Sequence, residues 1–392
     1  MLHSKFTLFL SLFIVLLGSS SCHTQSSPAL TGIITPQPGW KPVVYLVQPR
    51  HFAEVASGYS GILIDSAVIA PDGQFRFNAL PPNVAPGLFQ VCVQPVSSRF
   101  ANQLLDDDPT LANYLPIVLE KGKSVRIHAD ISRFQASLTM EQLTLENEAL
   151  LHLRDLRHAS FSKNLAHQAK PDENTLMEYE AAWARFRAPL MAFADSTRWL
   201  YPAVVAVRWV SPQADYERVP EFLSRQCQKW SPQNSDWARQ LCAAASPEKL
   251  PVQIGQIIPD YPLPVVSGDT ILLHGLLGKR LTVLDIWASW CAPCRRENRH
   301  VLTPLYQQYK SAGLQIIGYS IDSSPESWKA AIAKDGAVWL HTSHLSGDAT
   351  PFMEALHLTT IPANFILDSK GKIIAKNLHG EELSSFVSEY LK

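Results

Sequence analysis

The chain has 392 residues, 46% of them hydrophobic, which is enough to bury a large core in about two or three domains. Its 34 Lys and Arg residues nearly balance 35 Asp and Glu residues, so the formal net charge is −1 at pH 7. A nucleic-acid-binding protein normally carries a basic face, so this balance argues against nucleic acid as a partner. Six cysteines in so long a chain exclude a disulfide-scaffold protein.

The N-terminus has the pattern of an export signal. Lys5 precedes an apolar run over residues 6–17, and small residues follow at 18–21. The segment resembles a bacterial lipoprotein signal, so we predict that residues 1–22 are a signal peptide and that Cys22 is the lipidated residue. The alternative is an ordinary signal peptide that is cleaved nearby and leaves an unmodified Cys22. A lipid anchor would hold the protein on a membrane of the cell envelope, facing the periplasm.

Residues 28–130 are predicted to form a β-sandwich-like domain, because short β-branched and aromatic segments alternate with turn signals. The predicted strands cover residues 30–35, 43–47, 62–69, 74–78, 88–93, 117–120 and 124–129. The Pro-Asp-Gly turn at 71–73 is expected to close a hairpin. Residues 64–67 and 72–75 resemble a β domain of unknown function that precedes the redox domain in some bacterial lipoproteins. This region shows no catalytic constellation.

Residues 131–250 are predicted to be a helical linker or cap. Apolar residues recur at helical spacing over 143–156 and over 175–199. Cys227 and Cys242 lie on neighbouring helical segments, and the sequence leaves open whether they form a disulfide. We expect this region to connect the β domain to the last part of the chain and to shape the approach to it.

Residues 251–392 are predicted to form an α/β domain with mixed strand pairing, because strands and helices alternate and a hairpin and a helix follow. The predicted strands cover 282–287, 314–321, 363–367 and 372–375, and the predicted helices cover 293–310, 326–334 and 381–391.

Two cysteines stand at the first strand-to-helix junction of this domain. Cys291 and Cys294 belong to the segment Trp-Ala-Ser-Trp-Cys-Ala-Pro-Cys. A helix start stabilises an anion, so we expect Cys291 to be an exposed nucleophilic thiolate and Cys294, one turn on, to be the deeper resolving thiol. A zinc site lacks a second cysteine pair, and haem attachment lacks a His at position 295. A purely structural disulfide is the remaining alternative. No metal and no cofactor are predicted.

This region resembles the TlpA/ResA branch of thioredoxin-like proteins. The matching residues are Trp287, Trp290, Cys291, Pro293, Cys294, the Arg-Arg-Glu helix start at 295–297 and the Thr-Ile-Pro-Ala segment at 360–363. The resemblance implies a thioredoxin-like fold in which Pro362 is a cis proline beside Cys291. It also implies that the backbone of Ile361 pairs with a substrate strand, with Trp290 and Pro293 in the substrate-binding surface.

Asp285 matches the buried acid of thioredoxin, six residues before the first cysteine. A buried carboxyl has a raised pKa, so Asp285 could accept the proton of Cys294. The alternative is an Asp that only accepts hydrogen bonds. Glu297 could be either a family position or a surface residue. His341 and His344 are interpreted as loop residues, because no acid or thiol completes a metal site.

We therefore predict an exported, lipid-anchored thiol–disulfide oxidoreductase that reduces disulfides of periplasmic protein substrates. The Ala-Pro pair between the cysteines lacks the His of strongly oxidising relatives, which favours a reductant. The resemblance implies a transmembrane thiol or electron donor that recharges it. The alternatives are a disulfide oxidase or isomerase, a thiol peroxidase, and a binding lipoprotein in which the redox pair is incidental.

Overall fold

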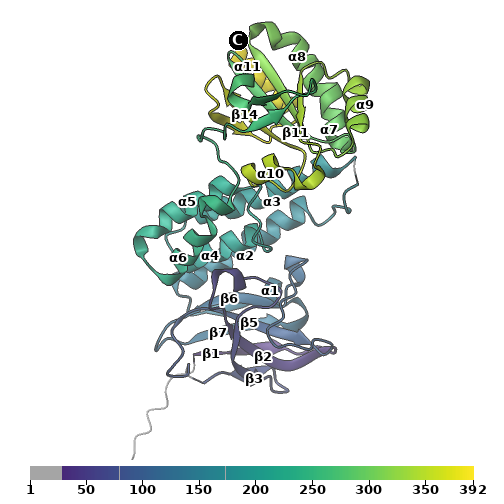
Figure 1. Ribbon diagram of the computed structural model, residues 1–392. Coiled ribbons are helices and arrows are strands. Elements are labelled where there is room, and N and C mark those ends of the chain that lie inside the picture. The colour runs from purple at the N-terminus through teal and green to yellow at the C-terminus, as the bar shows by residue number, and fades with distance from the viewer. Residues whose placement is uncertain (1–28, 79, 173) are drawn as a thin grey trace, which may run out of the picture.

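The computed structural model describes residues 29–392 except 79 and 173, and these residues stack in three layers (Figure 1). Two β-sheets form one end, a group of helices forms the middle, and an α/β sheet that contains the cysteine pair forms the other end. The predicted signal peptide and Cys22 lie outside the described residues. Within the described part of the chain, no helix combines the length and the hydropathy that a membrane crossing requires.

The first layer consists of two four-stranded sheets. One has the order β4-β1-β7-β8 and the other β3-β2-β5-β6. The strands are β1 (Leu30–Thr35), β2 (Trp40–Gln48), β3 (Ile62–Val68), β4 (Gln74–Arg76), β5 (Gly87–Pro95), β6 (Tyr114–Leu119), β7 (Val125–Asp130) and β8 (Thr139–Glu141). Each strand predicted from the sequence is present, and β8 extends the first sheet beyond residue 130.

The turn at 71–73 does not close a hairpin, so that prediction is wrong. β3 pairs with β2, whereas β4 pairs with β1 in the other sheet. Gly32 of β1 lies between Phe75 of β4 and Ile127 of β7, and a Cβ at this position would lie 2.1 Å from the Ile127 carbonyl oxygen and 2.8 Å from the Phe75 ring. The turn at 71–73 thus passes the chain from one sheet to the other, and the missing side chain of Gly32 leaves room for Phe75 in the core between them.

Within the second sheet, β5 and β6 are buried on both faces, which explains their largely apolar sequences. Phe89 and Val91 pack in the core between the two sheets. Leu88 and Cys92 point the other way and pack with the helices of the middle layer. Burial raises the pKa of the Cys92 thiol to about 12, so Cys92 is a neutral core residue and not a second reactive thiol.

Five longer helices make the middle layer: α2 (Leu145–Asn164), α3 (Leu176–Ser196), α4 (Leu200–Val210), α5 (Pro220–Trp230) and α6 (Asp236–Ala244). Buried cations join this layer to the sheets. Arg208 of α4 donates through Nε to the carbonyl of Val55 at 2.9 Å, and Arg157 of α2 makes a two-pronged pair with Asp106 at 2.9 and 2.7 Å. Although the Nε of Arg157 has no partner among the described residues, these charge-assisted bonds hold the two layers together.

The last layer has a five-stranded sheet of order β13-β12-β11-β14-β15. Its strands are β11 (Leu281–Trp287), β12 (Leu314–Ser320), β13 (Leu340–Ser343), β14 (Ala363–Asp368) and β15 (Ile373–Lys376). Its helices are α7 (Ala292–Glu297), α8 (Thr303–Tyr309), α9 (Pro325–Asp335), α10 (Pro351–Leu356) and α11 (Gly380–Leu391). β11 pairs parallel with β12 and antiparallel with β14, which gives the mixed pairing that the sequence predicts. A short hairpin of β9 (Pro262–Pro264) and β10 (Thr270–Leu272) precedes this sheet.

The sequence predicts one helix over 293–310, and the structure interrupts it. Between α7 and α8 runs a π-helical turn, Asn298–Leu302, in which the Thr303 amide donates to the Asn298 carbonyl five residues back. Pro304 follows at once and has no amide hydrogen to continue the regular hydrogen-bond pattern of the helix.

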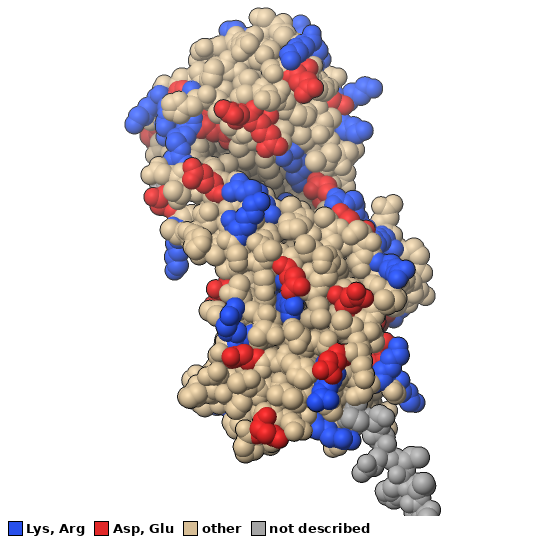
Figure 2. Space-filling view, turned by 180° about the vertical axis from the view of Figure 1, so that it is seen from behind, with Lys and Arg blue, Asp and Glu red and all other residues tan. Residues whose placement is uncertain are grey.

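The charged side chains on the face seen in Figure 2 are of both signs and are scattered over all three layers, and a recess separates the last layer from the helices.

Cys227 of α5 and Cys242 of α6 are joined by a disulfide with a Cα–Cα distance of 4.7 Å. The loop that it closes spans 15 residues, for which chain entropy gives a stabilisation of about 3 kcal/mol.

Replacing both Cys227 and Cys242 with Ser is therefore expected to lower the free energy of unfolding by about 2–3 kcal/mol, measured by urea denaturation. Reductant is the control, since it should destabilise the parent chain by a similar amount and the double variant much less. Equal stability of the two chains without reductant would contradict the prediction.

Candidate active site

The cysteine pair lies where the central strand β11 meets α7. All seven residues of β11 are buried, which fixes the exit direction of the chain towards the helix. Cys291 is the N-cap residue of α7, and its Sγ accepts a hydrogen bond from the backbone amide of Cys294 at 3.3 Å. The two sulfurs form a disulfide. When the pair is reduced, the same amide is placed to stabilise a thiolate on Cys291.

Both cysteines are largely shielded from solvent. Cys291 is 6% exposed and Cys294 2% exposed, so the expectation of an exposed Cys291 is wrong, although Cys294 is the deeper of the two. The reason is that both side chains pack in the apolar cluster that contains Trp287. Trp290, in contrast, is 60% exposed beside the pair. The side chain of Cys291 is therefore largely covered and lies next to an exposed aromatic side chain.

Two aspartates that the sequence analysis missed hold the loop before Cys291. Asp322 accepts hydrogen bonds from the amide of Ser289 at 2.9 Å and from its hydroxyl at 2.6 Å. Asp335 of α9 pairs with the guanidinium of Arg295, which also donates to the Ser289 carbonyl at 2.9 Å. Arg295 therefore helps to hold the loop before Cys291 in place. No sequence motif marks these aspartates, because they lie more than thirty positions away.

The segment before β14 approaches the cysteine loop. The peptide bond between Ile361 and Pro362 is cis. Pro362 and Pro293, the residue between the two cysteines, line the same cavity, so the tertiary fold brings together the two prolines named from the sequence. Ile361 lines it as well, half-buried, and its backbone amide makes no hydrogen bond with any described residue.

Two residues of the middle layer, which the sequence analysis missed, form hydrogen bonds with the segment before β14. Glu217, 8% exposed, accepts hydrogen bonds from the amides of Thr359 at 3.0 Å and Thr360 at 3.1 Å, and from both hydroxyls. Arg218 donates from Nη1 to the carbonyl of Pro362 at 3.4 Å. Charge-assisted bonds to two successive amides make this a strong contact between the layers. A loop Glu-Arg pair carries no signal that could have identified it in the sequence.

Asp285 lies on β11 and is 4% exposed. Among the described residues its carboxyl has no hydrogen-bond partner and no ion-pair partner. Burial, and secondly the charge of Glu297, raise the pKa of Asp285 well above its ordinary value. A carboxyl with such a pKa exchanges its proton closer to neutral pH than an exposed Asp does, as a proton acceptor for a buried thiol requires.

Glu297, the last residue of α7, is buried and faces the same region. It accepts a hydrogen bond from His379 Nδ1 at 2.7 Å and one from the amide of Gly380 at 3.1 Å, at the start of α11. The interpretation of Glu297 as a surface residue is therefore excluded. His379 was not found from the sequence, since it lies 82 positions from its partner.

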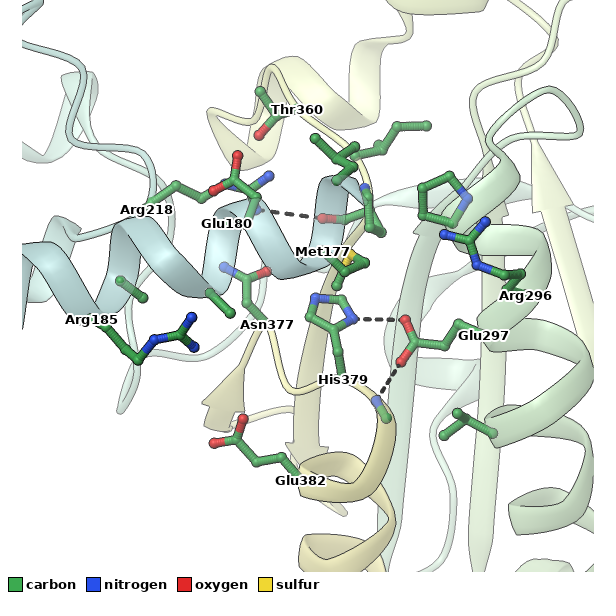
Figure 3. Close-up of a pocket in the computed structure, with 18 of the residues that line it drawn as sticks. Met177, Glu180, Arg185, Arg218, Arg296, Glu297, Thr360, Asn377, His379 and Glu382 are labelled. Atoms are coloured by element: carbon green, nitrogen blue, oxygen red, sulfur yellow. Dashed lines mark hydrogen bonds and ion pairs between the residues drawn. The ribbon is translucent and has the colours of Figure 1, made fainter. Parts of the chain in front are cut away.

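A cavity of about 1030 Å³ opens between α3 and the last layer (Figure 3). Figure 3 shows Met177, Glu180 and Arg185 of α3 on one side and the hydrogen-bonded pair of Glu297 and His379 on the other. The cavity thus runs along the prolines of the site and reaches the group that perturbs Asp285.

The described residues contain no cluster of three or more groups able to hold a metal ion. His341 is not a loop residue, because it lies in β13, is buried, and packs against Trp287. Burial lowers its pKa to about 4, which makes it a neutral core residue. His344 bonds to the hydroxyl of Tyr319 at 2.7 Å.

The sequence matches the AhpC/TSA family over residues 254–376. The thiol–disulfide oxidoreductase ResA of Bacillus anthracis is 27% identical over 145 residues, which are 37% of this chain and 80% of ResA. The thioredoxin-like protein YneN of Bacillus subtilis is 30% identical over 128 residues, 33% of this chain and 73% of YneN. A solved thiol–disulfide oxidoreductase from Bacteroides fragilis has 29% identity and covers 34% of this chain and 98% of its own, with a TM-score of 0.32.

A cysteine pair at a strand-to-helix junction, in a thioredoxin-like domain with these relatives, defines a thiol–disulfide oxidoreductase. The chain belongs to the TlpA/ResA-like family of thioredoxin-fold proteins. Such enzymes act on disulfide-containing protein substrates.

Asp285→Asn is expected to stabilise the protein in a pH-dependent manner. Since the folded-state pKa of Asp285 is raised, the wild-type chain binds a proton more tightly when folded, and it loses stability as the pH rises from the unfolded pKa, near 3.9, through the folded pKa. The gain of Asp285→Asn is therefore small at pH 4 and grows by at most about 1.4 kcal/mol per pH unit until Asp285 ionises in the folded state. Urea denaturation across this range measures it. A gain in stability that is constant with pH would show that the pKa of Asp285 is not raised in the folded state.

Proposed function

We propose that the protein reduces disulfides of other proteins in the cell envelope, through dithiol–disulfide exchange at Cys291 and Cys294. The observation that carries this proposal is the hydrogen bond from the Cys294 amide to Cys291 Sγ at the start of α7, reached from a strand that contains Asp285, a buried acid with a raised pKa. This arrangement supplies a stabilised attacking thiolate, a resolving thiol within reach and a proton acceptor.

In the first step the thiolate of Cys291 attacks one sulfur of a substrate disulfide. A mixed disulfide forms between Cys291 and the substrate, and the other substrate sulfur leaves as a thiolate, which takes a proton from water. We propose that Trp290, Pro293 and Ile361 contact the substrate at this stage. The exposed indole of Trp290 offers an apolar surface, and the amide of Ile361 is free to bond a substrate backbone.

In the second step Cys294 attacks Cys291. Asp285 takes the proton of the Cys294 thiol, the Cys291–Cys294 disulfide forms, and the second substrate sulfur leaves as a thiolate. This thiolate takes a proton from water, and Asp285 returns its proton to water. The substrate has then gained two electrons and two protons, and the oxidised pair must regain two electrons from a donor. We propose a transmembrane thiol or electron donor for this role.

The direction towards reduction is supported by the surroundings of the pair. The residues between the cysteines, Ala292 and Pro293, carry no charge that would stabilise a thiolate, and Arg295 is bound to Asp335. The nearby Glu297 disfavours an additional negative charge. A strong oxidant needs a highly stabilised reduced form, and these neighbours do not provide one.

Export and anchoring belong to the same proposal. They rest on the sequence of residues 1–22, with Cys22 as the lipidated residue.

We further propose that residues 28–130 are a β-sandwich-like domain, that 131–250 are a helical cap, and that the redox domain spans 251–392. The hydrogen bonds between Glu217 and the segment before Pro362 support a cap that helps to position the site.

Cys294→Ser is expected to accumulate mixed disulfides with substrate proteins, because the resolving thiol is gone while Cys291 still attacks. Non-reducing electrophoresis of envelope extracts would show adducts that disappear with dithiothreitol. The matched control is the chain with Cys291→Ser in addition, which should form none. If a folded Cys294→Ser chain yields no adducts beyond this control, the exchange mechanism is wrong.

The reduction potential of the Cys291–Cys294 pair tests the direction. We expect a value near or below about −220 mV, in the range of glutaredoxin and thioredoxin, from equilibration with glutathione or dithiothreitol buffers. A value near about −120 mV would instead indicate a donor of disulfides, the function of an oxidase. Cys291→Ser serves as the control that shows no redox-dependent signal from this pair.

A further inference from the structure

The cavity between α3 and the redox domain has one wall that lies outside the family match. Pro293, Ile361 and Pro362 line it from the redox domain, whereas α3 supplies the opposite wall. The match to the AhpC/TSA family begins at residue 254, so this second wall belongs to the additional part of the chain.

We propose that this cavity binds the polypeptide segment that flanks the substrate disulfide, with apolar side chains of that segment against α3 and the reacting sulfur at the rim formed by Pro293 and Pro362. The inference rests on the proposed attack of Cys291 on a protein disulfide. In this proposal the middle helices select substrate proteins according to the residues that flank the substrate cysteines.

The α3 wall has the chemistry of an adaptable apolar site. Met177, Ala181, Ala184 and Met191 follow one another at spacings of four, three and seven residues, which places them on one helix face. Ala181 and Ala184 are exposed in the cavity, and their small side chains leave room for those of a ligand. Methionine adapts to differently shaped apolar groups, so this face suits substrates that vary in sequence.

The size and position of the cavity indicate a polypeptide segment. Its volume of about 1030 Å³ lies at the upper end of the range for small-molecule pockets. It also continues along Ile361, whose backbone amide is available to bond an extended chain. Charged side chains of both signs line it too, among them Glu180, Arg185 and Glu382, so no single net charge is selected.

The two walls are held at a fixed distance. Glu217 bonds the amides of Thr359 and Thr360, and Arg218 bonds the Pro362 carbonyl. At the other end of the contact, Arg296 of α7 donates to the side chain of Asn174, two residues before α3, at 2.9 Å. A cavity fixed at both ends is pre-organised, which reduces the entropy lost on binding.

The test compares two peptides on the full chain carrying Cys294→Ser. Each peptide holds one cysteine as a mixed disulfide with thionitrobenzoate, flanked by Leu-Val and Val-Leu in one and by Gly-Ser and Ser-Gly in the other. Attack by Cys291 releases coloured thionitrobenzoate and leaves the peptide bound. Rates are corrected with the chain that lacks both cysteines, and are divided by the rate of the same variant with dithiobis(nitrobenzoate), which has no flanking residues.

The Leu-Val peptide is expected to react about tenfold faster than the Gly-Ser peptide, given the apolar area that it can bury. Ala184→Glu places a charge on the wall and should reduce this ratio to below about twofold. The control Ala192→Glu changes an exposed alanine of the same helix outside the cavity and should keep the ratio. Met177→Gln is the second wall variant and should lower the ratio at least about threefold, even where Ala184→Glu proves unfolded by circular dichroism.

Equal rates for the two peptides, or a ratio that neither wall variant changes, would overturn the inference and leave the proposed function intact. Failure of the parent Cys294→Ser chain to react even with dithiobis(nitrobenzoate) would overturn both, because Cys291 would then not be a competent nucleophile.

Discussion

The burial of β11 on both faces is the constraint on which the site depends. A central strand between a parallel and an antiparallel neighbour cannot shift its register, so the residues that follow it emerge at one point, where α7 begins. This places Cys291 at the start of α7 and leaves Asp285 buried within the strand. The low polarity that makes the strand stable is also what raises the pKa of the Asp285 carboxyl, so stability and chemistry have the same origin here.

Local signals made the redox domain predictable. Apart from the helix over 293–310, which a π-helical turn interrupts, the predicted strands and helices of this domain form within one or two residues of the predicted limits, and the spacing of Cys291 and Cys294 marks the pair that forms the disulfide. What was missed has a physical reason. β13 and α10 are short, and their apolar residues face the core without a clear period. The hairpin error at 71–73 arose because a turn signal does not say which sheet the next strand joins.

The contacts around the cysteines could not be predicted, because they connect positions far apart in the chain. Glu217 and Thr359 are separated by 142 positions, and Glu297 and His379 by 82. Each is an ordinary polar residue in its own segment, and only the tertiary fold gives it a partner. The exposure of Cys291 was overestimated for the same reason, since a helix start can be covered by packing from the rest of the domain.

The disulfide between Cys227 and Cys242 gives the molecule two opposite redox requirements. This bond ties α5 to α6 and has to be made once, by an oxidant, while the chain matures. In the proposed reducing cycle, the bond between Cys291 and Cys294 is opened in every turnover by a supply of electrons. Whatever delivers those electrons must therefore distinguish two disulfides within one chain, and the helices that carry the permanent one keep it away from the strand-to-helix junction where the exchangeable one lies.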